Sequence, residues 1–263
     1  MVGAAVAYFD AIATLSFSKS AFLDQQFYVP SAAAVPAAHA LFGTAHALFA
    51  IIADISQLAQ VRHIRYTSPQ ADANFRTMAA ELELQLQEWT PPSRISRPTS
   101  DPHLLHKVTA AGVMLQWAAL MRLHLIVHGS GSGSGSIGNS GSSFDGSSGM
   151  DDEIAHPMVR VAVSNILTAL ATIPRGDLVE SMLIFPVFAA GYGALCAEER
   201  CAVHERFAVM ERSIGFGNVF DAHEALLAHW DRLDRGVYAA AGRRASWEDV
   251  IRGAMPGGML IMS

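Results

Sequence analysis

The sequence predicts an all-α protein, a single domain of about eight to ten helices spanning residues 1–263. Its apolar runs are rich in Ala, Leu and Met, which favour helices, and strict alternation of apolar and polar residues is nearly absent. Hydrophobic residues make up 51% of the chain, enough to bury one large core or two small ones. Charged residues reach only 16%, so much of the surface must be small and neutral or covered by another part of a larger molecule.

The first two helices are expected on either side of a loop that contains two prolines. The first candidate covers residues 3–17, and the loop covers residues 24–36. The second helix covers residues 37–62, where apolar residues recur at spacings of three and four and form one face.

The next two helices carry the same start signal, an N-cap residue followed by proline. Ser68 and Pro69 begin a helix that ends at Trp89, ahead of two prolines. Asp101 and Pro102 begin the other, which continues to about His128. This last helix contains the most apolar long segment, residues 108–127, but that segment includes Gln116, Arg122 and His124. Because such groups are costly in a bilayer, we expect a buried helix and no membrane contact.

Residues 129–149 are a Gly/Ser-rich tract that buries too little apolar surface to fold, so we expect a long disordered loop within the domain. Helices are then expected over residues 154–173 and 178–197, with a turn at residues 174–177 between them. The second of these is apolar nearly all round, which predicts a central helix, and we expect Pro186 to kink it.

The last three expected helices have recognisable starts. An amphipathic helix covers residues 198–214 and ends at the Gly-rich turn 215–218, where Asn218 is expected to cap a helix that runs to about Leu233. Ser246 begins a final short helix in a pattern that resembles a capping box, with Asp249 at the third position.

The composition of the chain limits which partners and which compartment are expected. The net charge is −6, and lysine occurs only at Lys19 and Lys107, so the chain by itself is not expected to bind DNA, which requires clustered basic residues. The two cysteines, Cys196 and Cys201, suit a reducing compartment, and on one helix they would point apart. The N-terminal residues lack the basic start and the cleavage site of a signal peptide, so we expect an intracellular protein.

Motifs for metal binding or catalysis are incomplete. His223 and His229 are six residues apart, whereas the zinc-protease pattern needs four. His124 and His128 do have that spacing, but no third ligand is evident, and surface histidines are the simpler interpretation. The acidic run Asp151-Asp152-Glu153 resembles the start of a terpene-synthase metal motif but lacks its later carboxylate. No catalytic residue, metal ligand or cofactor site is therefore predicted.

Several sequence segments, taken in order, resemble those of a known family. LFGTAHALFAIIADISQLAQVR (residues 41–62), the helix end LQLQEWTPP (84–92) and the apolar helix 110–123 resemble, in this order, helices of the fungal-specific transcription factor domain. The most specific block is IFPVFAAGYGALCAEER (184–200), and a Gly-x-Gly-Asn turn and a helix ending in Trp follow it, as in that family. The residues that match are Phe185, Pro186, Phe188, Gly191, Ala194, Glu199, Arg200, Gly215, Gly217, Asn218 and Trp230.

The resemblance implies the C-terminal regulatory region of a fungal zinc-cluster transcription factor, which acts in the nucleus. Some relatives bind sterol-like molecules in a helical pocket, which makes a small apolar ligand an expectation here. The family's cluster of six cysteines that binds two zinc ions and contacts DNA has no counterpart among the two cysteines of this sequence. Zinc and DNA are therefore expected only through a separate N-terminal domain, and the chain is interpreted as a fragment, a truncated gene product or a member lacking that domain.

Three functions stay open at this point. The favoured one is a regulatory domain that senses a small apolar ligand. The second is an interaction module that dimerises or docks a co-regulator. The third is a helical enzyme that acts on apolar substrates, against which the missing acidic motifs count. For the matching residues, core packing of Phe185, Phe188 and Trp230 is the simplest role, and a pocket is the alternative.

Overall fold

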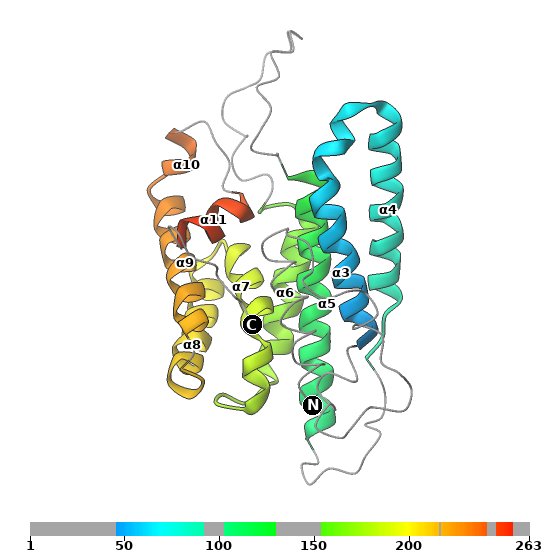
Figure 1. The fold of residues 1–263 in the computed structure, drawn as a ribbon. Helices are drawn as coiled ribbons and strands as arrows, with labels where there is room; N and C mark the ends of the chain where they lie inside the picture. The colour runs from blue at the N-terminus through cyan, green and yellow to red at the C-terminus, as the bar shows by residue number, and fades with distance from the viewer. Residues whose placement is uncertain (1–45, 92–102, 130–153, 216, 241–245, 255–263) are drawn as a thin grey trace.

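The computed structural model describes residues 46–91, 103–129, 154–215, 217–240 and 246–254, and every regular element within them is helical (Figure 1). The helices lie side by side as one all-α domain, with α3 and α4 at one edge, α5, α6 and α7 in the middle, and α8 and α9 at the other edge. The expected helix over residues 3–17, the loop over 24–36 and the Gly/Ser tract beyond Gly129 lie outside the described residues.

The first described pair of helices is an antiparallel hairpin. α3 (His46–Gln60) continues into the 3-10 helix η3 (Val61–Thr67), which leads to α4 (Pro69–Glu88). The start signal read from the sequence is confirmed, because the Ser68 side chain accepts a hydrogen bond from the Ala71 N–H and Pro69 is the first helical residue. α4 ends at Trp89, as expected.

The long helix α5 (Leu104–His128) packs against α3, α4, α6 and α7. Among the described helices it is the one that is long and apolar enough to cross a membrane, and 67% of its most apolar 18-residue window is buried inside the fold. Its polar groups have partners within the domain: Gln116 Nε2 donates to the carbonyls of Leu86 and Trp89, and Arg122 bonds to Glu248.

The region expected to form one kinked helix over residues 178–197 is divided, and this prediction was wrong. α6 (Pro157–Ala171) is followed by a turn, by the 3-10 helix η4 (Leu178–Met182), and by α7 (Ile184–Tyr192). The helical conformation is interrupted at Leu183, so Pro186 lies in the first turn of α7. The N–H groups of a first turn have no partner within the helix, so proline costs no helical hydrogen bond there and does not kink the helix. The expectation of a central position is confirmed, since every residue of α7 is buried.

Two antiparallel helices follow, α8 (Ala197–Ser213) and α9 (Gly217–Asp234). Gly215 has a φ of +67°, a left-handed conformation that ends α8 at little cost for glycine. Because α9 already begins at Gly217, Asn218 is its second residue and not the expected cap. Its backbone is therefore already helical, whereas a cap residue precedes the first helical residue.

The C-terminal part contains the short helix α10 (Val237–Ala240) and the helix α11 (Trp247–Ala254), which packs on α9. The expected start of α11 is confirmed, because Ser246 Oγ accepts a hydrogen bond from the Asp249 N–H. Trp247 is 1% exposed and is the largest fully buried side chain of the described part.

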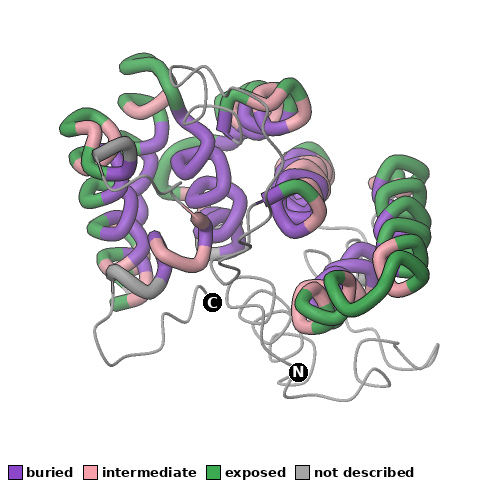
Figure 2. The backbone as a smooth tube through the Cα atoms, turned by 90° about the horizontal axis from the view of Figure 1, so that it is seen from above, coloured by how far each residue is buried: buried purple, intermediate pink, exposed green. Residues whose placement is uncertain are grey.

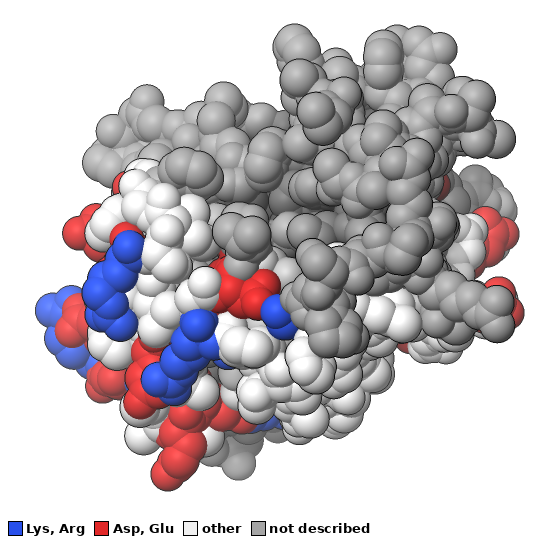
Figure 3. Space-filling view, turned by 90° about the horizontal axis from the view of Figure 1, so that it is seen from below, with Lys and Arg blue, Asp and Glu red and all other residues white. Residues whose placement is uncertain are grey.

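One continuous apolar core connects α3 to α11, so the helices on the two sides of the Gly/Ser tract form a single domain. Seen from above, buried residues line the sides of the helices that face one another, and exposed residues cover the outer sides of α4, α8 and α9 (Figure 2). On the face shown in Figure 3, acidic and basic side chains of the described residues are interspersed and form no continuous basic surface.

Candidate functional site

The aromatic residues of the family-like block are packed in the core. Phe185 and Phe188 are 0% exposed, and both meet the Trp247 ring edge-on, with ring centres 6.1 and 5.2 Å away. Tyr192 meets the same indole at 5.1 Å. The block thus forms an aromatic cluster around Trp247, which joins α7 to α11.

Gly191 and Trp230 connect α7 to α9. The indole Nε1 of Trp230 donates to the Gly191 carbonyl at 2.9 Å. A Cβ atom on Gly191 would lie 2.6 Å from a methyl group of Leu226, so any larger residue here would force that side chain to shift. The role of this pair is close helix packing.

Glu199 and Arg200 fix the start of α8. Glu199 accepts from the Leu195 N–H at 2.9 Å and forms an ion pair with Arg160. Burial raises the Glu199 pKa, but these donors hold it below its usual value. Arg200 bonds to both carboxylate oxygens of Asp234, and its Nε donates to the carbonyl of the buried Ala194.

The remaining matching residues, Gly215, Gly217 and Asn218, form the turn between α8 and α9, and Pro186 lies in the first turn of α7. None of the eleven matching residues lines the cavity described next. The structure therefore brings most of them together at the contacts of α7 with α8, α9 and α11, and it places the cavity elsewhere.

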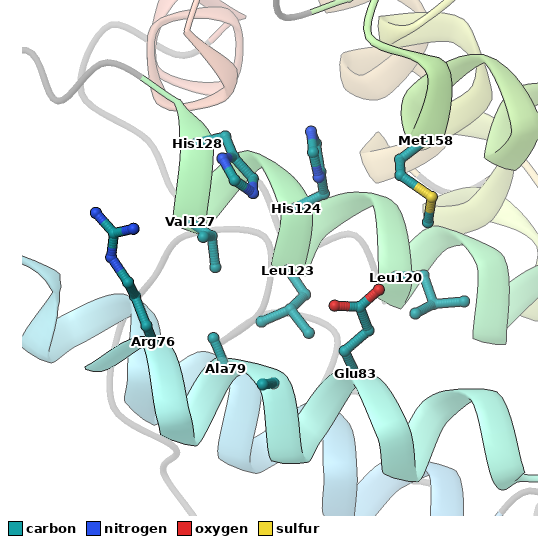
Figure 4. A pocket seen from close by; sticks show the side chains of 10 residues that line it. Arg76, Ala79, Glu83, Leu120, Leu123, His124, Val127, His128 and Met158 are labelled. Atoms are coloured by element: carbon teal, nitrogen blue, oxygen red, sulfur yellow. The ribbon is translucent and has the colours of Figure 1, made fainter. Parts of the chain in front are cut away.

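A cavity of about 110 Å³ lies between α4 and α5 and is closed at one end by Met158 of α6 (Figure 4). Its walls are mostly apolar, and its polar groups are Arg76 and Glu83 of α4 and two histidines of α5. The lining residues are Arg76, Ala79, Ala80, Glu83, Leu120, Leu123, His124, Val127, His128 and Met158. An apolar cavity with a few polar groups is the usual form of a small-molecule site.

Three imidazole rings lie close together beside this cavity. The ring centre of His124 is 4.4 Å from that of His128 and 4.0 Å from that of His156, the residue before α6. His128 and His156 are 6.0 Å apart and nearly parallel. His156 Nδ1 accepts from the Met158 N–H, which caps α6 and leaves the proton of the neutral ring on Nε2.

The pKa values of the two α5 histidines are depressed. Burial, followed by the charges of His156 and His128, lowers the pKa of His124 to about 4. Burial and the neighbouring His156, Arg65 and Arg76 lower the pKa of His128 as well, although Glu83 opposes them. Near neutral pH both rings are therefore uncharged, and each offers one hydrogen-bond donor and one acceptor.

The sequence indicated the pair His124 and His128 but gave no third partner. The third partner is His156, which follows the Gly/Ser tract and is too distant in the sequence for a local pattern to predict the contact. The described residues contain no group of His, Cys, Asp and Glu arranged to hold a metal ion. The cluster is better suited to hydrogen bonding and ring stacking than to metal ligation.

We expect the histidine cluster to make folding stability depend on pH. An unfolded histidine titrates near pH 6.5, whereas His124 titrates at about 4 in the folded state, so the unfolded chain binds more protons between these values. Stability is therefore fully present above pH 6.5 and is lost as pH falls towards 4. Because His124 is partly exposed and solvent weakens the effect, the loss in the free energy of unfolding should be about 1–2 kcal/mol.

The measurement is urea unfolding of the wild type and of His124→Gln at pH 7, 5.5 and 4.5. Between pH 7 and 4.5, the free energy of unfolding of the variant should fall by about 1–2 kcal/mol less than that of the wild type. His106→Gln, an exposed position on the same helix, serves as the control. Equal pH dependence in all three proteins would contradict the assignment.

The fold and the site define a class: an all-α domain with one aromatic core and a small interhelical cavity, whose described residues contain no group of His, Cys, Asp and Glu that could hold a metal ion. The model of the fungal specific transcription factor domain matches residues 1–259, so the chain belongs to this family. That assignment gives the protein a regulatory role in transcription. Neither a curated protein nor a solved structure gives a significant match.

Proposed function

We propose that the chain is the regulatory domain of a zinc-cluster factor that controls transcription by RNA polymerase II in the nucleus. In this proposal a small, mainly apolar ligand binds in the cavity between α4 and α5 and changes the activity of the attached DNA-binding part. Zinc and DNA contact belong to that separate part, and this chain performs no catalysis. Family membership supports the regulatory role, and the cavity supports the ligand.

The geometry of the cavity restricts the ligand. Drug-sized ligands occupy about 300–1,000 Å³, whereas an apolar cavity of roughly 150 Å³ holds a benzene molecule. A cavity of about 110 Å³ therefore accommodates a compact molecule or one end of a larger, sterol-like one. Leu120, Leu123 and Met158 would contact its apolar part, and a neutral His124 or His128 would bond to one hydroxyl or carbonyl group.

The position of the cavity determines how ligand binding would affect the rest of the domain. α5 forms one wall of the cavity and also carries Arg122, which bonds to Glu248 of α11. A ligand that changes the spacing of α4 and α5 would therefore act on the helix that packs against most of the domain. The ligand must favour one arrangement over the other for this to have an effect.

The test uses phenol as a compact apolar probe and Ala80→Phe as a blocking variant. Ala80 is exposed at the rim of the cavity, so the larger side chain should close the entrance without disturbing the core. Ala73→Phe, an exposed position on the same helix outside the cavity lining, is the matched control. Phenol at ten times its dissociation constant should raise the melting temperature of the wild type and of the control by about 3–5 °C, and of the blocked variant by less than about 1 °C.

Regulation is measured with the chain fused to a heterologous DNA-binding domain upstream of a reporter gene. Ala80→Phe should change the reporter output, whereas Ala73→Phe should not. Equal melting shifts in all three proteins would contradict the cavity as the site.

The alternative function is an interaction module, which one observation favours. Phe220 and Leu227 lie seven residues apart on α9 and are 45% and 42% exposed, so they share one outward face. A module of this kind needs no ligand. Reporter output that responds to changes at Phe220 and Leu227, and not to Ala80→Phe, would favour it.

A further inference from the structure

Two arginines approach the same carboxylate at the start of α11. Arg122 of α5 is 1% exposed, and its Nη2 donates to Glu248 Oε1 at 2.7 Å. The guanidinium also lies over the Trp247 ring, 5.1 Å from its centre. Arg122 therefore has both a charge partner and an aromatic face.

Arg62 is the second arginine, in the first turn of η3, where α3 ends. Burial raises the Glu248 pKa, but the positive charges of Arg122 and Arg62 lower it below its usual value, which shows that Arg62 is within electrostatic reach of that carboxylate. Yet Nε and Nη2 of Arg62 are buried and have no hydrogen-bond partner among the residues that the structure describes.

Three other arginines of the described part, Arg65, Arg160 and Arg206, each have a carboxylate acceptor for their guanidinium. A buried charged donor without an acceptor is costly, and folded proteins rarely retain one. The two donors of Arg62 thus indicate a site for an acceptor from outside the chain.

The geometry of the two free donors identifies the chemistry of that acceptor. Nε and Nη2 form one edge of the planar guanidinium, and their N–H groups point in parallel. This two-donor fork matches two oxygens of a carboxylate or a phosphate. The charges agree, since two guanidinium groups and the Glu248 carboxylate leave one positive charge in excess.

We propose that Arg62 is the main donor of a binding site for a small oxyanion, the carboxylate or phosphate group of a metabolite, at the junction of η3, α5 and α11. The bound oxyanion receives two hydrogen bonds from Arg62 and a longer-range attraction from Arg122. It lies close to Glu248, so it competes with that carboxylate for Arg122. Occupancy would therefore alter how firmly α11 is held, and none of Arg62, Arg122 and Glu248 lines the cavity between α4 and α5.

The experiment compares the melting temperature of the full chain in sodium chloride with that in inorganic phosphate, succinate or acetate at equal ionic strength and pH. The wild type should gain about 2–4 °C in the effective anion relative to chloride. A response to phosphate alone assigns a phosphate ligand, and a response to succinate or acetate assigns a carboxylate. The cavity-blocking Ala80→Phe should respond like the wild type, which separates this site from the proposed ligand cavity.

Variants identify the donor. Arg62→Met should abolish the anion response and, in chloride, should be at least as stable as the wild type, because it removes an unsatisfied buried charge. Arg62→Lys keeps the charge but loses the fork, so it should retain less than half of the response. Arg212→Met, at an exposed arginine of α8, is the control and should respond fully.

Two outcomes would overturn the proposal. One is an equal melting temperature in chloride and in all three oxyanions. The other is a full anion response in Arg62→Met, since it would show that Arg62 is not the donor.

Discussion

Replacing Arg206 with methionine should lower the free energy of unfolding by about 3–5 kcal/mol. Arg206 of α8 is 5% exposed, and its Nη1 donates to Glu180 Oε1 at 2.6 Å. Glu180 is 0% exposed, so the substitution leaves a carboxylate buried without its charge partner. Burying an uncompensated charge is among the most destabilising effects of a single substitution.

The same guanidinium also ends α6. Nη2 donates to the carbonyls of Leu170 and Ile173 at 2.8 and 2.9 Å, at the C-terminal end of α6. Arg206 therefore connects α8, η4 and the end of α6. Part of the expected loss in the free energy of unfolding comes from losing the bonds to these carbonyl groups. This part should remain when Glu180 is replaced as well.

Urea unfolding of three proteins separates these contributions. The double variant Arg206→Met/Glu180→Gln, which has no buried charge, should regain about half of the loss. Arg175→Met removes an ion pair with Glu205 in which both side chains are well exposed, and it should cost less than about 1 kcal/mol. Equal losses for Arg206→Met and Arg175→Met would show that the buried pair contributes no more than a surface one.

Unlike the long-range contacts of Arg206, several helix boundaries could be predicted from the sequence alone. The starts of α4 and α11 were predictable because Ser68 and Ser246 act on an N–H group only three residues further along the chain. The extent of α8 followed from its amphipathic pattern and from Gly215. Local signals of this kind depend on neighbouring residues and need no knowledge of the tertiary fold.

The division of residues 178–197 could not be read from the pattern. A uniformly apolar stretch has no helical periodicity that would distinguish a 3-10 turn followed by a short helix from one long helix. Pro186 is compatible with both a kink and a first turn. The packing of Val179, Met182 and α7 in the core selects the second arrangement.

The candidate sites depend on contacts between distant residues. Glu248 lies 126 positions from Arg122, and Glu180 lies 26 positions from Arg206. His156 joins the α5 histidines only through the packing of α6 on α5. The family resemblance correctly indicated the fold and the family, but its matching residues form helix contacts, while the cavity and the buried arginines carry no pattern along the sequence.

Phe188→Ala should be the most destabilising change at the matching residues, with an expected cost of about 3–5 kcal/mol. Phe188 is 0% exposed and lies in the middle of α7, where each neighbouring residue is also buried. Its ring meets Trp247 edge-on, at an angle of 87°, which is a favourable aromatic geometry. Removing the ring takes away apolar burial and leaves a cavity that the surrounding helices cannot easily fill.

The substitution should also release α11. Helix α11 has eight residues, too few for an isolated helix to be stable in water, so its order depends on the packing of Trp247 against α7 and on the bond from Arg122. With Phe188 removed, we expect the tryptophan fluorescence, to which Trp247 contributes, to shift towards longer wavelengths at urea concentrations below the main unfolding transition. Phe220→Ala, at an exposed phenylalanine of α9, is the matched control and should cost less than about 1 kcal/mol. A loss below about 1 kcal/mol for Phe188→Ala would mean that its ring lines an open space, and α7 would then replace the α4–α5 cavity as the place to look for a ligand.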